Sequence, residues 1–157
     1  MDLGSGGGVP GLVLAWHRPQ IRWTLLDGSQ RRGAFLTEAV ADLDLGGCVD
    51  VVPERAEIAG RGSLRHTQDL VVARGFAGPA VTAECAAPLL AVGGRLVVSE
   101  PPGGAPERWP AQVLRTLGLV PHRAVASPIA LQVLRQTEPC PDRYPRRVGV
   151  PGKHPLF

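Results

Sequence analysis

Short apolar runs alternate with amphipathic segments along most of this chain. The apolar runs, several rich in β-branched residues, predict strands at residues 21–27, 49–52, 69–74, 95–99, 120–126 and 129–135. Apolar positions at three- and four-residue spacing predict helices at residues 10–17, from the cap residue Ser29 to Gly46, at 79–92 and at 111–117. In the second of these helices, one buried face is expected from Phe35, Leu36, Ala39, Val40 and Leu43.

This alternation predicts an α/β fold. Strands separated by helices need crossover connections, so they form a mostly parallel, twisted, Rossmann-like sheet. The last two strands have no helix between them, which predicts an antiparallel hairpin at one edge. The chain has 157 residues, 44% of them hydrophobic, enough to bury one core. We therefore expect a single core at residues 1–138, followed by a basic, proline-rich tail at residues 139–157.

Residues 2–11 form a glycine-dense loop that opens with Asp2. Gly4, Gly6 and Gly8 permit positive φ and let the backbone pass close under a ligand, toward which the loop N–H groups are expected to face. The loop therefore predicts a nucleotide-type cofactor site. Such a loop should follow a buried strand of about five residues, yet only Met1 precedes Asp2. We therefore expect a first strand that is largely missing, in a chain truncated at its N-terminus.

Two cofactors are compatible with this loop. Residues 6–11 satisfy the dinucleotide pattern G-x-G-x-x-G, and Asp27 follows at the distance expected of a ribose-binding acid. Asp2, placed at the mouth of the site, would oppose the diphosphate of a dinucleotide but attract a cation. S-adenosylmethionine carries a sulfonium and an ammonium group and no phosphate, so Asp2 favours this methyl donor. The alternative is that Asp2 only caps the following helix.

The excess positive charge lies in the tail. Residues 1–142 hold 13 basic and 14 acidic residues, whereas residues 143–157 hold four basic residues and no acid, so the net charge is +3. The four cations are Arg143, Arg146, Arg147 and Lys153. Three prolines in this segment favour an extended strip of cations that would suit a phosphate backbone. A solvated terminus is the alternative.

Several other function classes lack support in the sequence. No apolar run approaches the length of a membrane helix and no basic-then-apolar leader opens the chain, so we expect a cytoplasmic monomer without membrane contact. The cysteines and histidines lack metal-ligand spacing, and no metal is expected. Cys48 and Cys85 are expected to be buried.

Five sequence blocks, in the right order along nearly the whole chain, resemble one family. They are Asp2 to Gly11, Leu25 to Ser29 with Arg31-Arg32 and Phe35-Leu36, Arg55 to Glu57, Val72 to Phe76, and Tyr144 to Lys153. The family is that of the bacterial small-subunit ribosomal RNA guanine-N7 methyltransferases, also called glucose-inhibited division protein B. Five co-linear blocks, with the Pro-Gly end of the glycine loop and the Tyr-Pro-Arg-Arg tail among them, are more specific than any one motif.

The resemblance implies a class I, S-adenosylmethionine-dependent enzyme that methylates a guanine in the decoding region of 16S rRNA, with the small ribosomal subunit as its partner. By position, it implies donor contacts from Gly4 and Val9, adenine-side contacts from Ala56 and Glu57, and a binding-site role for Arg74. The predicted cofactor-binding residues are Asp2, Gly4, Gly6, Gly8, Val9, Asp27, Ala56, Glu57 and Arg74, and the predicted RNA-binding residues are the four tail cations.

Guanine N7 has an in-plane lone pair and carries no proton, so its methylation needs placement and electrostatics rather than a general base or a metal. The chain accordingly shows no His, Cys or paired-carboxylate constellation. Arg74 is the predicted catalytic residue, with a salt bridge to Glu57 or Asp69 as the alternative. Phe76 could stack on an extruded base or belong to the core.

The sequence departs from the family after the fifth strand of the family fold, where Glu100-Pro101 replaces the usual Lys-Gly. An anion in place of a cation is expected to weaken phosphate contact there. The family's helical N-terminal region and first strand are also absent from the sequence. These departures leave open an inactive relative that binds the ribosome. The dinucleotide pattern leaves open a nicotinamide-dependent oxidoreductase, and methylation of a small molecule or a protein is the third alternative.

Overall fold

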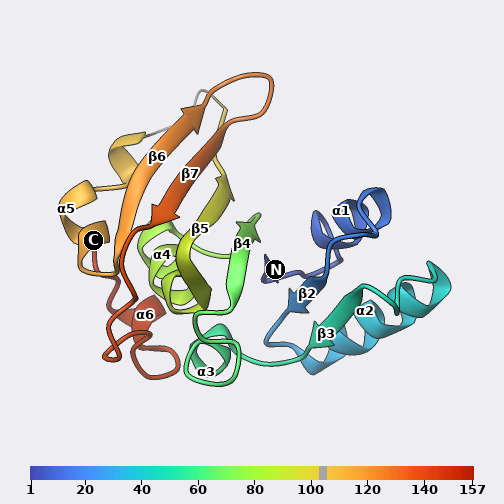
Figure 1. Cartoon of the computed structure of the whole chain (residues 1–157). Coiled ribbons are helices and arrows are strands. Elements are labelled where there is room, and N and C mark those ends of the chain that lie inside the picture. The colour runs from blue at the N-terminus through green and yellow to red at the C-terminus, as the bar shows by residue number, and fades with distance from the viewer. Residues whose placement is uncertain (103–105) are drawn as a thin grey trace.

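A seven-stranded mixed sheet organises the protein, whose computed structural model describes residues 1–102 and 106–157. The strands are β1 (Asp2–Leu3), β2 (Trp23–Leu26), β3 (Val49–Val52), β4 (Gln68–Ala73), β5 (Leu90–Ser99), β6 (Leu119–Val125) and β7 (Leu131–Gln136). Their order is β3-β2-β1-β4-β5-β7-β6 (Figure 1). All neighbours are parallel except β7, which is antiparallel to β5 and β6. The predicted α/β sheet with a terminal hairpin is confirmed.

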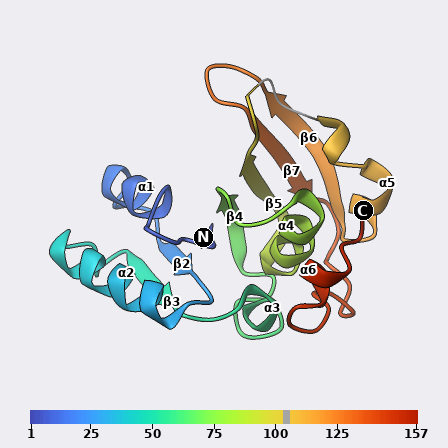
Figure 2. The ribbon, with the colours of Figure 1, turned by 180° about the vertical axis from the view of Figure 1, so that it is seen from behind.

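Helices cover both faces of this sheet. They are α1 (Gly11–His17), α2 (Gln30–Asp42), α3 (Ala56–Ala59), α4 (Pro79–Ala86), α5 (Ala111–Arg115) and α6 (Val150–Lys153), with the 3-10 turns η1 (Ala87–Leu89) and η2 (Pro106–Arg108). Figures 1 and 2 show α1 and α2 beside β1 to β3, and α4 to α6 gathered at the other end of the sheet. Among the described residues, no helix is long and apolar enough to span a membrane.

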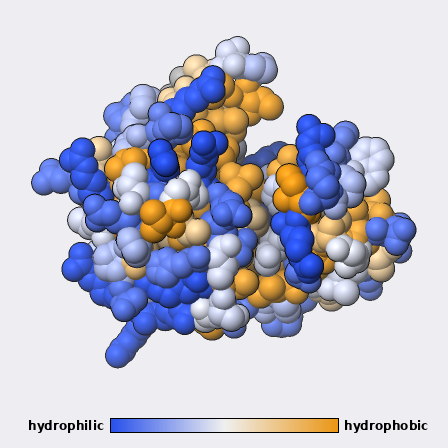
Figure 3. Space-filling view, in the orientation of Figure 1, coloured by the Kyte–Doolittle hydropathy of each residue, from blue (hydrophilic) through white to orange (hydrophobic). Residues whose placement is uncertain are grey.

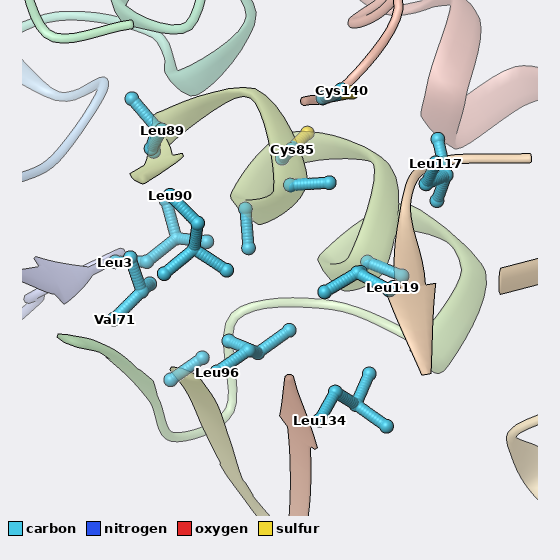
Figure 4. Close-up of a cluster of buried hydrophobic side chains, with 14 of the residues drawn as sticks. Leu3, Val71, Cys85, Leu89, Leu90, Leu96, Leu117, Leu119, Leu134 and Cys140 are labelled. Carbon is cyan, nitrogen blue, oxygen red and sulfur yellow. The ribbon is translucent and has the colours of Figure 1, made fainter. Parts of the chain in front are cut away.

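Two apolar clusters fill the spaces between sheet and helices. Leu25 and Val72 join the cluster under α1 and α2, whereas their neighbours Leu26 and Val71 join the cluster under α4. This division follows from the alternation of side chains along a strand. Figure 4 shows the larger cluster, in which leucines from β5, β6 and β7 surround α4. The predicted burial of Cys48 and Cys85 is confirmed.

The central strand of the sheet, β1, is short. β1 has two residues, which pair with β2 on one side and with β4 on the other. The α-ammonium of Met1 donates a hydrogen bond to the carbonyl of Leu70 at 2.7 Å. A cavity of about 310 Å³ lies there, lined by Met1 and by residues of β2, β3 and β4.

Two predicted elements differ from the observed ones. The helix predicted at 79–92 ends at Ala86, and β5 begins at Leu90, because Pro88 lacks the N–H that a continuing helix needs. In α2, only Gly33, Leu36 and Val40 are buried. Phe35, which was expected on the buried face, is exposed, because successive helical residues point about 100° apart.

The C-terminal segment is folded onto the domain. Cys140 and Tyr144 are buried in the larger cluster, and α6 contacts α4. Hydrophilic residues, blue in Figure 3, cover this part of the molecule at the lower left. The expected extended strip is therefore wrong for the helical residues 150–153.

Candidate functional site

A cavity of about 440 Å³ opens at the carboxyl ends of the parallel strands, where ligands bind in open α/β sheets. Its walls come from the segments that follow β1, β2, β3 and β4, from α4 and from the C-terminal segment. They are Gly4, Asp27, Gly28, Ser29, Arg32, Arg55, Ala56, Glu57, Gly75, Phe76, Ala77, Val81, Cys85, Gly149 and Gly152. We call it the donor cavity. Gly4, Asp27, Ala56 and Glu57, all predicted from the sequence, meet here.

The glycine loop has the predicted backbone conformation. Gly4, Gly6 and Gly8 have φ of 73°, 55° and 86°. A Cβ atom on Gly4 would lie 2.5 Å from Cδ2 of Phe76, so the close approach requires glycine. The amides of Gly4 and Ser5 donate to the carbonyl of Leu26 at 2.8 and 3.1 Å. Contrary to the expectation, these N–H groups are used within the protein.

Asp2 lies beneath the loop, so its predicted position at the mouth is wrong. Its side chain is buried and does not line the donor cavity. Oδ2 accepts a hydrogen bond from the amide of Gly11 at 2.9 Å, which fixes the start of α1. Within the described residues, Oδ1 has no partner. Burial raises the pKa of this carboxyl, and the hydrogen bond from Gly11 opposes that effect.

Asp27 directly follows β2 and lines the donor cavity. One oxygen, Oδ1, accepts from the amide of Ser29 at 2.9 Å, and the other, Oδ2, accepts from the amide of Gly6 at 2.9 Å. Arg32 lies 3.6 Å from Oδ2. This buried carboxylate therefore joins the glycine loop to the start of α2.

Glu57 lies on the opposite wall and connects it to the C-terminal segment. Arg55 holds its carboxylate through two hydrogen bonds, at 2.9 and 3.3 Å, and the amide of Gly149 donates to Oε1 at 3.0 Å. Burial alone would raise the pKa of Glu57, but the hydrogen bonds from Arg55 and Gly149 outweigh it, and the pKa lies below its ordinary value. Glu57 is therefore ionised at neutral pH.

These contacts set the chemistry of the cavity. A dinucleotide site needs free loop amides for its diphosphate, but the amides of Gly4, Ser5 and Gly6 already have partners. Two buried carboxylates, Asp27 and Glu57, face the cavity instead. The arrangement suits a ligand with hydroxyl and amino donors and without phosphate.

Other predicted residues lie outside this cavity. Arg74 is exposed at the end of β4 and does not line the donor cavity. In the part of the chain that the structure describes, it makes no ion pair, so the alternative pairing with Glu57 or Asp69 is absent. Val9 is exposed and, like Gly6 and Gly8, is absent from the lining of the donor cavity.

A smaller cavity, of about 120 Å³, adjoins the donor cavity, and we call it the side cavity. Gly75, Phe76 and Ala77 line both. The far wall of the side cavity includes Glu100 and Trp109. The sequence had suggested for Phe76 either core packing or a contact with a base, and the structure places it between two cavities.

The tail cations divide into two groups. Arg146 is bound to Glu84, a fully buried carboxylate in α4, through four hydrogen bonds of 2.6 to 3.1 Å. Its guanidinium also donates to the carbonyl of His154 at 2.7 Å. The predicted RNA contact of Arg146 is therefore corrected to a structural ion pair. Arg143, Arg147 and Lys153 are exposed.

A second group of cations was missed by sequence reasoning. Arg95 in β5 lies directly opposite Arg135 in β7, and Arg123 in β6 lies opposite Val133. All three arginines are exposed, and the strand register places them on the same face as Val97, which packs against the cluster under α1 and α2. In the sequence, Arg95 and Arg135 alternate with core-facing leucines, which indicates that they are exposed. That the three arginines are neighbours on one face follows only from the strand register.

The donor cavity also includes residues without a sequence signal, notably Cys85 of α4 and Gly152 of α6. Burial raises the pKa of the Cys85 thiol far above its ordinary value, so the sulfur is a neutral wall group. Across residues 1–102 and 106–157, no group of three or more His, Cys, Asp and Glu side chains could hold a metal ion.

Known proteins resemble this chain in sequence and in fold. The model of the GidB family, described as rRNA small subunit methyltransferase G, matches residues 1–100. The ribosomal RNA small subunit methyltransferase G of Moorella thermoacetica is 36% identical over 165 residues, which cover 99% of this chain and 68% of that protein. The protein of the same name from Thermotoga sp. strain RQ2 is 39% identical over 164 residues, covering 100% of this chain and 71% of that protein.

The fold also matches solved methyltransferase structures. One of them, StiE O-MT, superposes with a TM-score of 0.65 at 12% identity, over 88% of this chain and 67% of that one. The architecture is the Rossmann-like class I methyltransferase fold. With the family model matching residues 1–100, this chain belongs to the rRNA small subunit methyltransferase G family.

Proposed function

We propose that this protein transfers a methyl group from S-adenosylmethionine to N7 of a guanine in the decoding region of 16S rRNA, in the small ribosomal subunit. The observation that carries the proposal is the donor cavity of a family member, which is lined by two buried carboxylates, Asp27 and Glu57, while the amides of Gly4, Ser5 and Gly6 are already paired within the protein. Relatives named as small-subunit rRNA methyltransferases support the choice of substrate.

The donor cavity fits the methyl donor on three sides. Asp27, with each oxygen taking one backbone amide, keeps lone pairs free for the ribose hydroxyls. Ala56 and Glu57 form the wall for the adenine, and Gly4 forms a floor without a side chain. When bound, the donor supplies a methyl group on a cationic sulfur.

The reaction needs no proton transfer. The N7 lone pair forms the new bond to the methyl carbon while the carbon–sulfur bond breaks, and its electron pair stays on sulfur. The residues of the chain therefore contribute by placing the two reactants in line and by excluding water. We assign to Arg74, exposed at the rim beside Gly75, the orientation of the incoming nucleotide through its phosphate.

RNA would approach over exposed cations. Arg143, Arg147 and Lys153 lie on the C-terminal segment, next to the donor cavity wall formed by Gly149 and Gly152. Arg95, Arg123 and Arg135 lie on the open face of the sheet. Like charges placed directly opposite, as Arg95 and Arg135 are, destabilise a sheet, and a polyanion would relieve that repulsion.

Calorimetry and a transfer assay test the function. We expect heat from S-adenosylmethionine binding and none from a nicotinamide dinucleotide, and radiolabelled methyl transfer to unmethylated small subunits. Binding of the dinucleotide alone would replace the proposal with the oxidoreductase alternative. Binding of the donor without any transfer would favour an inactive ribosome-binding relative.

A further inference from the structure

We propose that the side cavity holds the target guanine and that Glu100 reads its Watson–Crick edge. This assignment rests on the proposed function, since it names the place of the substrate base. It concerns Glu100, the residue that follows β5.

The side cavity lies where a base must lie. It is formed by the segment after β4, by the end of β5 and by Arg108 and Trp109. Because Gly75, Phe76 and Ala77 line it together with the donor cavity, a group held there sits directly beside the donor. Its volume of about 120 Å³ is below that of pockets for drug-sized ligands, and it suits a single flat base. Phe76 supplies an aromatic surface between the two cavities.

Glu100 is a prepared hydrogen-bond acceptor in this cavity. Its side chain is only 4% exposed, Trp109 Nε1 donates to Oε1 at 3.0 Å, and Arg108 donates to Oε2. Each carboxylate oxygen accepts about two hydrogen bonds, so one site on each oxygen stays open. The anion that the sequence analysis expected to weaken phosphate contact is buried and paired with Arg108 in the structure.

The hydrogen-bond donors of guanine match the carboxylate of Glu100. Guanine presents N1–H and an exocyclic amine side by side, which a carboxylate accepts in parallel, whereas adenine presents an acceptor at N1. N7 lies on the Hoogsteen edge, which the contact of N1–H and the exocyclic amine with a carboxylate leaves free. A guanine held by Glu100 through its N1 edge can therefore turn N7 toward the donor cavity.

The same carboxylate favours the reaction electrostatically. Methylation at N7 makes the base cationic, and the carboxylate of Glu100, which Arg108 neutralises only in part, stabilises that charge as it develops. Glu100 therefore contributes both to the choice of guanine and to the rate.

The first test compares the wild type, Glu100→Gln and Glu107→Gln in methyl transfer to unmethylated small subunits. Glu107 is exposed in the same loop and provides the matched control. We expect E100Q to lower kcat/KM for the subunit roughly 10- to 100-fold, the size of discrimination that a bidentate base contact gives. The Kd for the donor should stay the same in E100Q, and E107Q should keep wild-type kinetics.

Wild-type turnover by E100Q overturns the assignment while the proposed function stands. A wild type that transfers no methyl group overturns both. Because E100Q replaces one of the two acceptor oxygens that face Arg108 and Trp109 by an NH2 group and can disturb the loop, a second measurement uses only the wild type. A subunit carrying inosine, which keeps N7 but lacks the exocyclic amine, in place of the target guanosine should react about tenfold more slowly. Equal rates on the two subunits would mean that Glu100 has only a structural role.

Discussion

At the residue scale, two buried glutamates hold the C-terminal segment in place. Glu57 accepts a hydrogen bond from the amide of Gly149, and Glu84 binds the guanidinium and amide of Arg146. Both carboxylates are separated from their partners by more than 60 positions in the sequence. The stability of the tail therefore depends on ionised groups in the core.

Replacing Glu57 with Gln should destabilise the protein in a pH-dependent way. The pKa of Glu57 lies below 4.5 in the folded protein, so its ionised form stabilises the fold above pH 4.5, and this contribution is lost as pH falls through the lower folded value. We expect E57Q to cost about 1.5–3 kcal/mol near pH 7, the range for hydrogen bonds to charged groups. Chemical unfolding from pH 7 to pH 3 should show that the difference in the free energy of unfolding between the wild type and E57Q becomes smaller below pH 4.5. A difference that does not change with pH would contradict the assigned ionisation.

Replacing Arg146 with Ala should cost much more than replacing Arg147. Removing Arg146 leaves the charge of Glu84 buried and unpaired, which typically costs about 3–5 kcal/mol. Arg147→Ala, an exposed neighbour, should change the free energy of unfolding by less than about 0.5 kcal/mol. Urea unfolding of both variants measures the difference. Similar losses would argue against the ion pair.

At the element scale, the glycine loop is held by its own partners as much as by a ligand. Asp27 accepts from the amide of Gly6 in the middle of the loop, and Asp2 accepts from the amide of Gly11 at its end. The loop is therefore shaped before the donor binds, and part of its geometry depends on Asp2, which does not line the donor cavity.

The variants Gly4→Ala and Gly7→Ala test whether the loop needs glycine at Gly4 in particular or tolerates a side chain at any of its positions. Gly4 has positive φ and faces Phe76, whereas a Cβ on Gly7 would meet no atom within 4 Å. We expect Gly4→Ala to cost about 1–2 kcal/mol from backbone strain alone and to weaken donor binding at least about tenfold. Gly7→Ala should bind as the wild type does. Calorimetry measures the affinity of both variants for S-adenosylmethionine. Equal affinities would contradict the contact between Gly4 and the donor.

The sequence could predict these elements where local rules decide them. The positive φ of Gly4, Gly6 and Gly8 and the acid at the end of β2 follow from residue type and from the position of strand ends. The place of Asp2 under the loop could not be predicted, because it depends on which amide lies within reach in three dimensions. The pairing of Arg146 with Glu84 likewise joins distant parts of the chain, and it overrode the extended tail that the prolines favour.

At the scale of the whole molecule, the two faces of the sheet differ. α4 and α5 cover the larger cluster, while on the other face the strands β5, β7 and β6 carry exposed arginines. The paired position of Arg95 and Arg135 gives this open face a local positive charge, although residues 1–142 are nearly neutral overall.

Removing both arginines should weaken RNA binding in a salt-dependent way. For Arg95→Ala with Arg135→Ala, we expect lower affinity for the small subunit and a salt slope reduced by about 1–2, as two phosphate contacts would give. The donor Kd should not change. Arg115→Ala, an exposed cation on α5, is the control. An unchanged slope in the double variant would exclude this face from the RNA interface.

The hydrogen bond between Glu57 and Gly149 has one further consequence. Gly149 and Gly152 form part of the donor cavity wall, and the same short segment carries Arg147 and Lys153 at its surface. When the ribosome binds these cations and displaces the segment, the wall of the donor cavity formed by Gly149 and Gly152 would be displaced with it. Cofactor exchange and docking on the ribosome would then be energetically coupled, and each would change the affinity of the other by the same factor.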